Sequence, residues 1–84
     1  MNTRHYISFD WEHNQKQIED CFDLAKSKLG AMYPQYTLLS SDMFGIDIYN
    51  DNTDTVVAQY STGITNDNLL AMQNIDTKEV CIFE

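Results

Sequence analysis

Residues 43–61, MFGIDIYNDNTDTVVAQYS, decide the fold. Two segments with alternating apolar residues flank the polar run 50–54, and this pattern predicts a β-hairpin with a longer loop. The apolar residues at even positions of 44–48 should face the core, so Asp47 and Tyr49 should face away from it. The second strand carries apolar residues on both faces, and the pattern leaves open which set points inward.

The hairpin lies within a stretch that has no basic residue. Between Leu29 and Thr77 the sequence contains no Lys or Arg, whereas it contains six aspartates: Asp42, Asp47, Asp51, Asp54, Asp67 and Asp76. The 84 residues carry 13 acidic against 5 basic side chains, which gives a formal net charge of −8. Such a surface repels nucleic acids and anionic membranes, and it attracts basic proteins.

The segment before the hairpin predicts one strand and one helix. Residues 4–11 alternate apolar and polar side chains, which is typical of a strand. Asn14 is placed to cap a helix of about 15 residues, with Gln17 completing a capping box and Gly30 ending the helix. The apolar face of this helix is formed by residues at helical spacing: Ile18, Cys21, Phe22, Ala25 and Leu29.

Three further elements are predicted around the hairpin. Residues 36–40 form a strand before it, and residues 80–83 form a strand near the end of the sequence. The second hairpin strand should end at Gly63, because glycine often marks the end of a strand pattern. A second short helix should then begin at Thr65 or Asn66, which are suitable caps.

The order of these elements predicts an α+β fold. We expect a single domain over residues 1–84, with a mostly antiparallel sheet of four to five strands. The long helix should pack on one face of this sheet, which leaves the other face in water. Asp47 and Tyr49 would then lie on the open face.

No pattern in the sequence indicates a catalytic or metal centre. The polar run 50–54 departs from a calcium-binding loop, because Thr55 stands where that loop needs glycine and Ser61 where it needs glutamate. His5 and His13 are the only histidines, and nothing in their spacing fixes a metal geometry. The sequence has no glycine-rich phosphate loop and no serine-nucleophile motif. We therefore expect no enzyme activity, no cofactor and no metal.

The two cysteines, Cys21 and Cys81, have a spacing that matches no zinc or redox motif. A disulfide between them stays open, but buried free thiols in a reducing compartment are the preferred interpretation. Few basic residues are present to lower their pKa, so reactive thiolates are not expected. Because the first residues resemble a strand and not a signal peptide, we expect a cytoplasmic protein, in the host cytoplasm if it is phage-encoded.

Size and charge favour a function in protein binding. The first hypothesis is an inhibitor that presents carboxylates to the basic nucleic-acid-binding surface of an enzyme, as nucleic-acid mimics of the phage anti-defence or nuclease-immunity type do. The alternative is an acidic interaction module or subunit with no inhibitory role, anchored by Tyr49, Trp11 and Tyr33. A lesser alternative is an antitoxin-like regulator, although the charge disfavours direct contact with nucleic acid. No motif resembles a known family.

The residues expected to contact a basic partner lie on the hairpin, the helix and the loops. Short aspartate side chains hold a carboxylate close to the backbone and lose little rotamer entropy when they are fixed. Tyrosine is enriched among the residues that dominate protein interfaces. The predicted binding residues are Asp42, Asp47, Tyr49, Asp51, Asp54, Asp67, Glu19 and Asp23.

Overall fold

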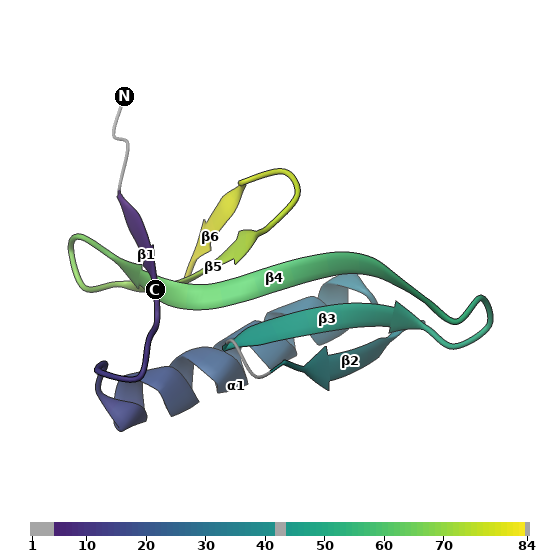
Figure 1. The fold of residues 1–84 in the computed structure, drawn as a ribbon, viewed down its shortest axis with the longest axis horizontal. Helices are drawn as coiled ribbons and strands as arrows, with labels where there is room; N and C mark the ends of the chain where they lie inside the picture. The colour runs from purple at the N-terminus through teal and green to yellow at the C-terminus, as the bar shows by residue number, and fades with distance from the viewer. Residues whose placement is uncertain (1–4, 42–43, 84) are drawn as a thin grey trace.

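The computed structural model describes residues 5–41 and 44–83, and it confirms an α+β fold (Figure 1). The elements in chain order are β1 (Tyr6–Ser8), α1 (Gln15–Met32), β2 (Thr37–Ser40), β3 (Gly45–Asn50), β4 (Thr55–Thr65), β5 (Leu70–Asn74) and β6 (Val80–Ile82). Over the described residues, six strands form one antiparallel sheet, which is one strand more than expected. Five strands follow the order β2-β3-β4-β5-β6, and β1 pairs with β4 beside this path.

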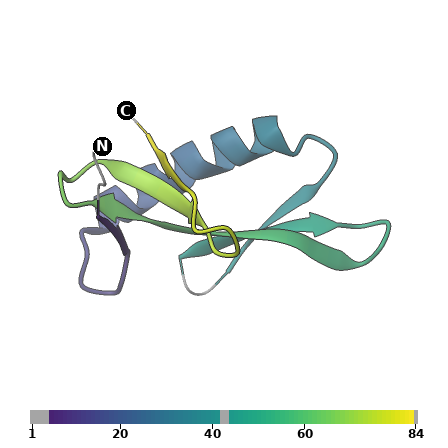
Figure 2. The same ribbon diagram turned by 90° about the horizontal axis from the view of Figure 1, so that it is seen from above.

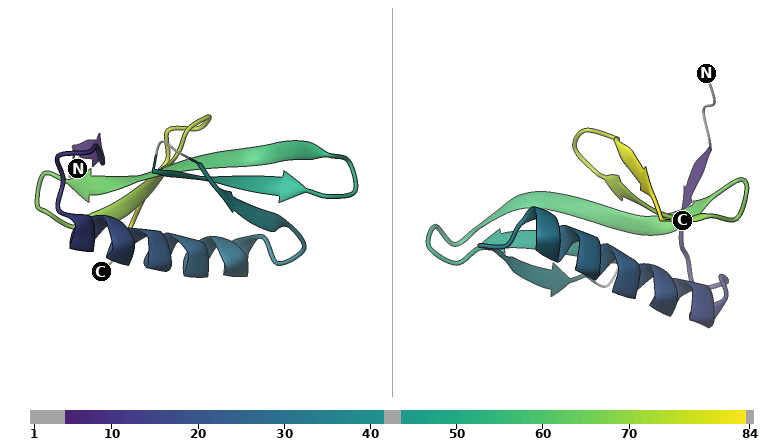
Figure 3. Two further views of the ribbon diagram at one scale, coloured as in Figure 1. Left: turned by 60° about the horizontal axis from the view of Figure 1, so that its bottom comes forward. Right: turned by 180° about the vertical axis from the view of Figure 1, so that it is seen from behind.

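Helix α1 covers one face of the sheet, as Figure 3 shows from two sides. Its buried residues repeat at helical spacing, so they form one apolar face. In the C-terminal half, Ala25 and Leu29 pack with inward side chains of three strands, among them Ile46, Ile48 and Met72. In the N-terminal half, a second cluster joins helix and sheet through Phe9, Ile18, Cys21 and Ile64. The predicted contact Phe22 is only half-buried and touches both clusters.

The hairpin forms as predicted between β3 and β4. Ile46 and Ile48 are buried in the core, and Asp47 and Tyr49 alternate with them toward the opposite face. The alternation of a strand therefore places the acidic and aromatic side chains on the face that the helix does not cover.

The structure also decides the orientation of β4, which the sequence left open. Ala58 and Tyr60 belong to the core cluster, so these two even-numbered residues of the strand point inward. The register shifts between Ile48 and Tyr49: Ile48 pairs with Ala58, whereas Tyr49 pairs with Val56. This bulge lets the strand bend toward the hairpin loop.

Strand β4 continues to Thr65 and does not end at Gly63 as expected. Strand β1 pairs with this extra length, with Ile7 opposite Ile64 and Ser8 opposite Gly63. The two backbones lie so close that a Cβ atom at position 63 would overlap the carbonyl oxygen of Ile7. Glycine is therefore required here for the close approach of a second strand.

Strand β1 is shorter than the alternating segment 4–11 predicts. Asp10 ends it, because its carboxylate accepts the backbone N–H of Glu12 at 3.0 Å and its carbonyl accepts that of His13 at 3.2 Å. Trp11 consequently lies in a turn, is 84% exposed and does not belong to the strand.

Helix α1 begins as predicted and ends later than predicted. The side-chain oxygen of Asn14 accepts the backbone N–H groups of the residues two and three positions further on, at 2.8 and 3.3 Å. The helix passes through Gly30 and ends at Met32, so it contains 18 residues. Glycine disfavours a helix by only about 1 kcal/mol relative to alanine, whereas Pro34 cannot continue one.

The predicted second helix after Thr65 is wrong, because the chain turns there and forms β5. The Thr65 hydroxyl accepts the backbone N–H groups of Asp67 and Leu69 at 3.3 and 3.2 Å, and so it closes a turn. Asn68 has a φ of 63°, a left-handed conformation that does not occur within helices. Asp67 therefore lies in a turn between two strands.

We expect Leu29→Ala to lower the free energy of unfolding by roughly 2–5 kcal/mol, because Leu29 is fully buried between helix and sheet. Leu24→Ala is the matched control in the same helix: Leu24 is 44% exposed, so its loss should stay near 0.5 kcal/mol, about the usual surface value. Urea unfolding followed by circular dichroism measures both. Equal losses would show that the helix faces are assigned wrongly.

Candidate functional site

The open face of the sheet carries the residues that best match the predicted binding site. On β3, Asp47 lies in register with Leu39 of β2 and with Gln59 of β4. Two residues further on, Tyr49 lies opposite Val56. Directly opposed residues of an antiparallel pair share one face of the sheet. We call this set, Leu39, Asp47, Tyr49, Val56 and Gln59, the outer patch.

The outer patch combines apolar area with a carboxylate. Leu39 on β2 is 43% exposed and Val56 on β4 is 47% exposed. Tyr49 is half-buried and lies on β3, the strand between them. The Asp47 carboxylate accepts one long hydrogen bond, 3.4 Å, from the Gln59 amide. Aliphatic and aromatic side chains around a carboxylate on a rigid sheet are suited to contact with another protein.

The loop between β3 and β4 extends the acidic surface beyond the outer patch. The Asp51 carboxylate accepts a hydrogen bond of 2.7 Å from the Thr37 hydroxyl, which holds it beside the start of β2. Asp54 has a φ of 57°, a left-handed conformation that aspartate tolerates better than most residues. We call Asp47, Asp51 and Asp54 the hairpin carboxylates. Within residues 5–41 and 44–83, no three metal-ligating side chains come together.

Two acidic residues of the helix lie close to lysines, and this distinguishes the helix from the hairpin. On α1, the Lys16 ammonium lies 2.9 Å from the Asp20 carboxylate, and the Lys26 ammonium lies 4.0 Å from that of Asp23. In the described part of the chain, no lysine or arginine forms an ion pair with a hairpin carboxylate. The helix charges are thus partly neutralised within the helix, whereas the hairpin carboxylates can pair with cations of a partner.

The eight predicted binding residues do not share one face. Glu19 and Asp23 lie on the exposed side of α1, across the sheet from the outer patch. Asp67 follows the far end of β4, whose 11 residues span about 36 Å. Figures 1 and 2 show the loops before and after β4 at opposite ends of the molecule. Asp42 lies outside the described residues, so the structure brings together only Tyr49 and the hairpin carboxylates.

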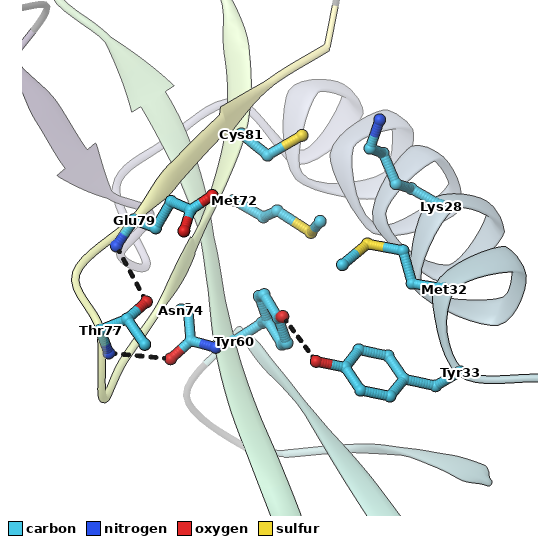
Figure 4. A pocket seen from close by; sticks show the side chains of 9 residues that line it. All are labelled: Lys28, Met32, Tyr33, Tyr60, Met72, Asn74, Thr77, Glu79 and Cys81. Atoms are coloured by element: carbon cyan, nitrogen blue, oxygen red, sulfur yellow. Dashed lines mark hydrogen bonds between the residues drawn. The ribbon is translucent and has the colours of Figure 1, made fainter.

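A groove of about 400 Å³ lies between the C-terminal half of α1 and the β5–β6 hairpin (Figure 4). Met32 and Met72 point toward each other across it, one from the helix and one from the sheet. Lys28 and Glu79 lie on its opposite sides and, among the described residues, form no ion pair with each other. Its volume is at the lower end of the range for small-molecule pockets.

Two tyrosines join the end of the helix to the sheet at this groove. The hydroxyl oxygens of Tyr33 and Tyr60 lie 3.0 Å apart, and the two rings meet edge to face. The hydrogen bond to Tyr60, together with burial, raises the pKa of Tyr33 to about 12, because the ionised form can no longer donate this bond. The hydrogen bond of this pair therefore links the end of α1 to β4.

Both cysteines are free thiols, as the sequence favours. Cys21 is fully buried, and its thiol donates to the carbonyl oxygen of Ala71 at 3.2 Å. Burial raises the pKa of the Cys21 thiol, so it remains protonated at neutral pH. A protonated, buried thiol packs as a small apolar side chain and is a poor nucleophile.

Sequence reasoning missed three residues of the outer patch: Leu39, Val56 and Gln59. Alternation in β2 places one of the adjacent Leu38 and Leu39 on the outer face, and the structure shows that it is Leu39, because Leu38 packs against the core. No such signal exists for Val56 and Gln59, since both faces of β4 carry apolar residues near the hairpin loop. The register of the sheet was needed to place them beside Asp47 and Tyr49.

Comparisons with protein-family models, with curated proteins and with solved structures find no match for this chain. No helix among the described residues is both long and apolar enough to cross a membrane. Function must therefore be inferred from the residues, their register and their charges.

We expect a tyrosinate absorbance step near pH 12 that is missing in Tyr33→Phe. The pKa of Tyr33 is raised above its usual value of 10.0, so the stabilisation from the pair is complete below pH 10.0 and is lost as the pH rises through about 12. Alkaline titration followed by absorbance and circular dichroism measures both effects. Tyr36→Phe is the control and should retain the late step; a late step that survives Tyr33→Phe would contradict the assignment.

Proposed function

We propose that this protein acts by stoichiometric binding to a basic protein surface, through the outer patch and the hairpin carboxylates. The observation that supports this proposal is the position of three carboxylates that form no ion pair with a lysine or arginine in residues 5–41 and 44–83, beside exposed apolar and aromatic side chains. The same face of the sheet is the one that α1 leaves uncovered. Charge attracts the partner, and the apolar side chains exclude water once it is bound.

The combination of charge and apolar area matters for affinity. An exposed ion pair contributes only about 0–1 kcal/mol, because water and salt screen it. Carboxylates that meet Arg or Lys in a desolvated interface couple by about 1.5–7 kcal/mol. Leu39, Tyr49 and Val56 supply the surface that removes water around Asp47.

The partner that we propose is a nucleic-acid-binding enzyme or complex, and the proposed effect of binding is inhibition. Its basic groove already accepts a row of phosphates, and carboxylates can take some of those positions. Duplex DNA carries one charge per roughly 1.7 Å of its axis, so three carboxylates replace only part of a phosphate track. The apolar part of the outer patch must therefore supply much of the affinity.

The second candidate function is that of an acidic interaction module without inhibition, and it uses the same surface. An assay of the partner's activity separates the two. Inhibition at one equivalent of this protein supports the first proposal, whereas full activity of the saturated complex supports the second.

We expect the triple variant Asp47→Asn, Asp51→Asn, Asp54→Asn to bind its partner at least tenfold more weakly, because each lost charge is paired in the interface. Asparagine keeps the oxygen that accepts the Thr37 hydroxyl, so the melting temperature should stay nearly constant. Calorimetric titration of the purified partner at low and physiological salt measures affinity and its salt dependence, and the salt dependence should fall.

The matched control is Glu19→Gln, Asp20→Asn, Asp23→Asn, which removes three charges from α1: two from exposed residues and one from the half-buried Asp20. It should leave the affinity nearly unchanged if the hairpin forms the contact. Equal weakening by both triple variants would show that only the net charge matters. If both variants bind as tightly as the original protein, the acidic residues serve solubility and do not contribute to binding.

A further inference from the structure

The free edge of β2 is the feature that the proposed function does not use. β2 ends the strand order of the sheet, so among the described strands only β3 pairs with it. Residues 33–41 contain no charged side chain, in a chain whose formal net charge is −8. Soluble proteins usually protect such edges with charges, proline or a bulge. Between Thr37 and Ser40, β2 has none of these features.

The β2–β3 ladder determines which backbone groups of β2 face outward. The Ser41 N–H donates to the Gly45 carbonyl at 2.9 Å, in line with the register of the ladder. Hydrogen-bonded and non-hydrogen-bonded pairs alternate along an antiparallel ladder, so the odd-numbered residues of β2 bond to β3. The N–H and C=O groups of Leu38 and Ser40 therefore point away from β3, along the free edge.

We propose that two copies of this protein pair through β2, antiparallel, about a two-fold axis at Leu39. In this arrangement Leu38 of each copy lies opposite Ser40 of the other, and their outward N–H and C=O groups bond to each other. Leu39 then meets its own counterpart in the non-hydrogen-bonded position between these pairs, where side chains of opposed residues are closest. The sheet becomes continuous across the two copies.

A second copy fits this edge better than an unrelated strand does, because the edge is self-complementary. The same two residues provide and satisfy all of the outward backbone groups, as an isologous interface requires. The neutral stretch lets two acidic molecules approach without opposing like charges at the seam. Leu39, 43% exposed in one copy, is covered by its counterpart.

The other free edges are less suited to this pairing. Strand β6 is preceded directly by Lys78 and Glu79, which place charges beside the edge. Strand β1 has three residues and is followed by the turn at Asp10. The side chains of β2 itself are uncharged, so its backbone hydrogen bonds can form without a charged side chain of the strand beside them.

Pairing through β2 has a consequence for the outer patch. A two-fold axis perpendicular to the sheet keeps both helices on one face and both outer patches on the other.

Each copy carries a net charge of −8, so the copies repel each other at a distance, and salt screens this repulsion. Self-association should therefore strengthen with salt, whereas binding to a basic partner should weaken with salt.

The test is analytical ultracentrifugation of the full chain, without any partner, from micromolar to millimolar concentration at low and physiological salt. We expect a reversible monomer–dimer equilibrium that shifts toward the dimer as salt rises. A protein that stays monomeric under all of these conditions overturns the proposal. Because no partner is present, the result is independent of the function proposed for the outer patch.

Ser40→Pro locates the interface. Proline removes one outward N–H without removing a β2–β3 hydrogen bond, so dimerisation should weaken at least tenfold while the melting temperature stays close to that of the original protein. Ser8→Pro is the matched control: the Phe9 N–H bonds to Thr62 of β4, so the Ser8 N–H also points to a free edge, that of β1. A dimer that Ser40→Pro leaves intact overturns the proposal.

A charge-exchange experiment tests the register without proline. Leu39→Glu and Leu39→Lys each place two like charges opposite each other at the axis, so each variant alone should be monomeric. An equimolar mixture should form a heterodimer, because the opposed charges now attract. A mixture that remains monomeric, with both variants folded, overturns the pairing of Leu39 with itself.

Discussion

The pairing of β4 with three other strands is the constraint on which the rest of this structure depends. Along one edge β4 pairs first with β3 and then with β1, and along the other edge it pairs with β5. Gly63 lies where β1 and β5 both pair with β4, and a side chain there would overlap the carbonyl oxygen of Ile7. The Cys21 sulfur lies 3.2 Å from the carbonyl oxygen of Ala71, to which the thiol donates, and 3.7 Å from that of Gly63, so α1 contacts the sheet at the same place.

The unequal lengths of α1 and β4 create the exposed surfaces. The helix is about 27 Å long and covers the inner face, whereas β4 spans about 36 Å. The hairpin tip therefore extends past the packed core, and residues 51–57 are all exposed. The outer patch lies where the sheet is held rigid by the core on one side and remains in contact with water on the other.

Charge distinguishes the two surfaces that we assign to binding. The hairpin carboxylates in and beside the outer patch form no ion pair with a lysine or arginine of the described residues, so this surface favours a basic partner and responds to salt as an ion-pairing surface does. The β2 edge is neutral and bonds through its backbone, so it favours a second copy. The two surfaces share Leu39, which belongs to the outer patch and also lies at the two-fold axis of the β2 pairing.

The sequence by itself determined the α+β class, the cap at Asn14, the buried face of α1 and the outward direction of Asp47 and Tyr49, because local periodicity carries each of these. The tertiary structure alone decided that Gly63 admits a second strand, that the chain after Thr65 forms β5, and that Val56 and Gln59 lie beside the acidic residues. These depend on which strands pair and in which register, and contacts between distant residues leave no periodic signal in a single sequence. The tertiary structure also decided that the acidic residues are spread over the helix, the hairpin and the far loop, because the positions of carboxylates relative to one another depend on the folded backbone.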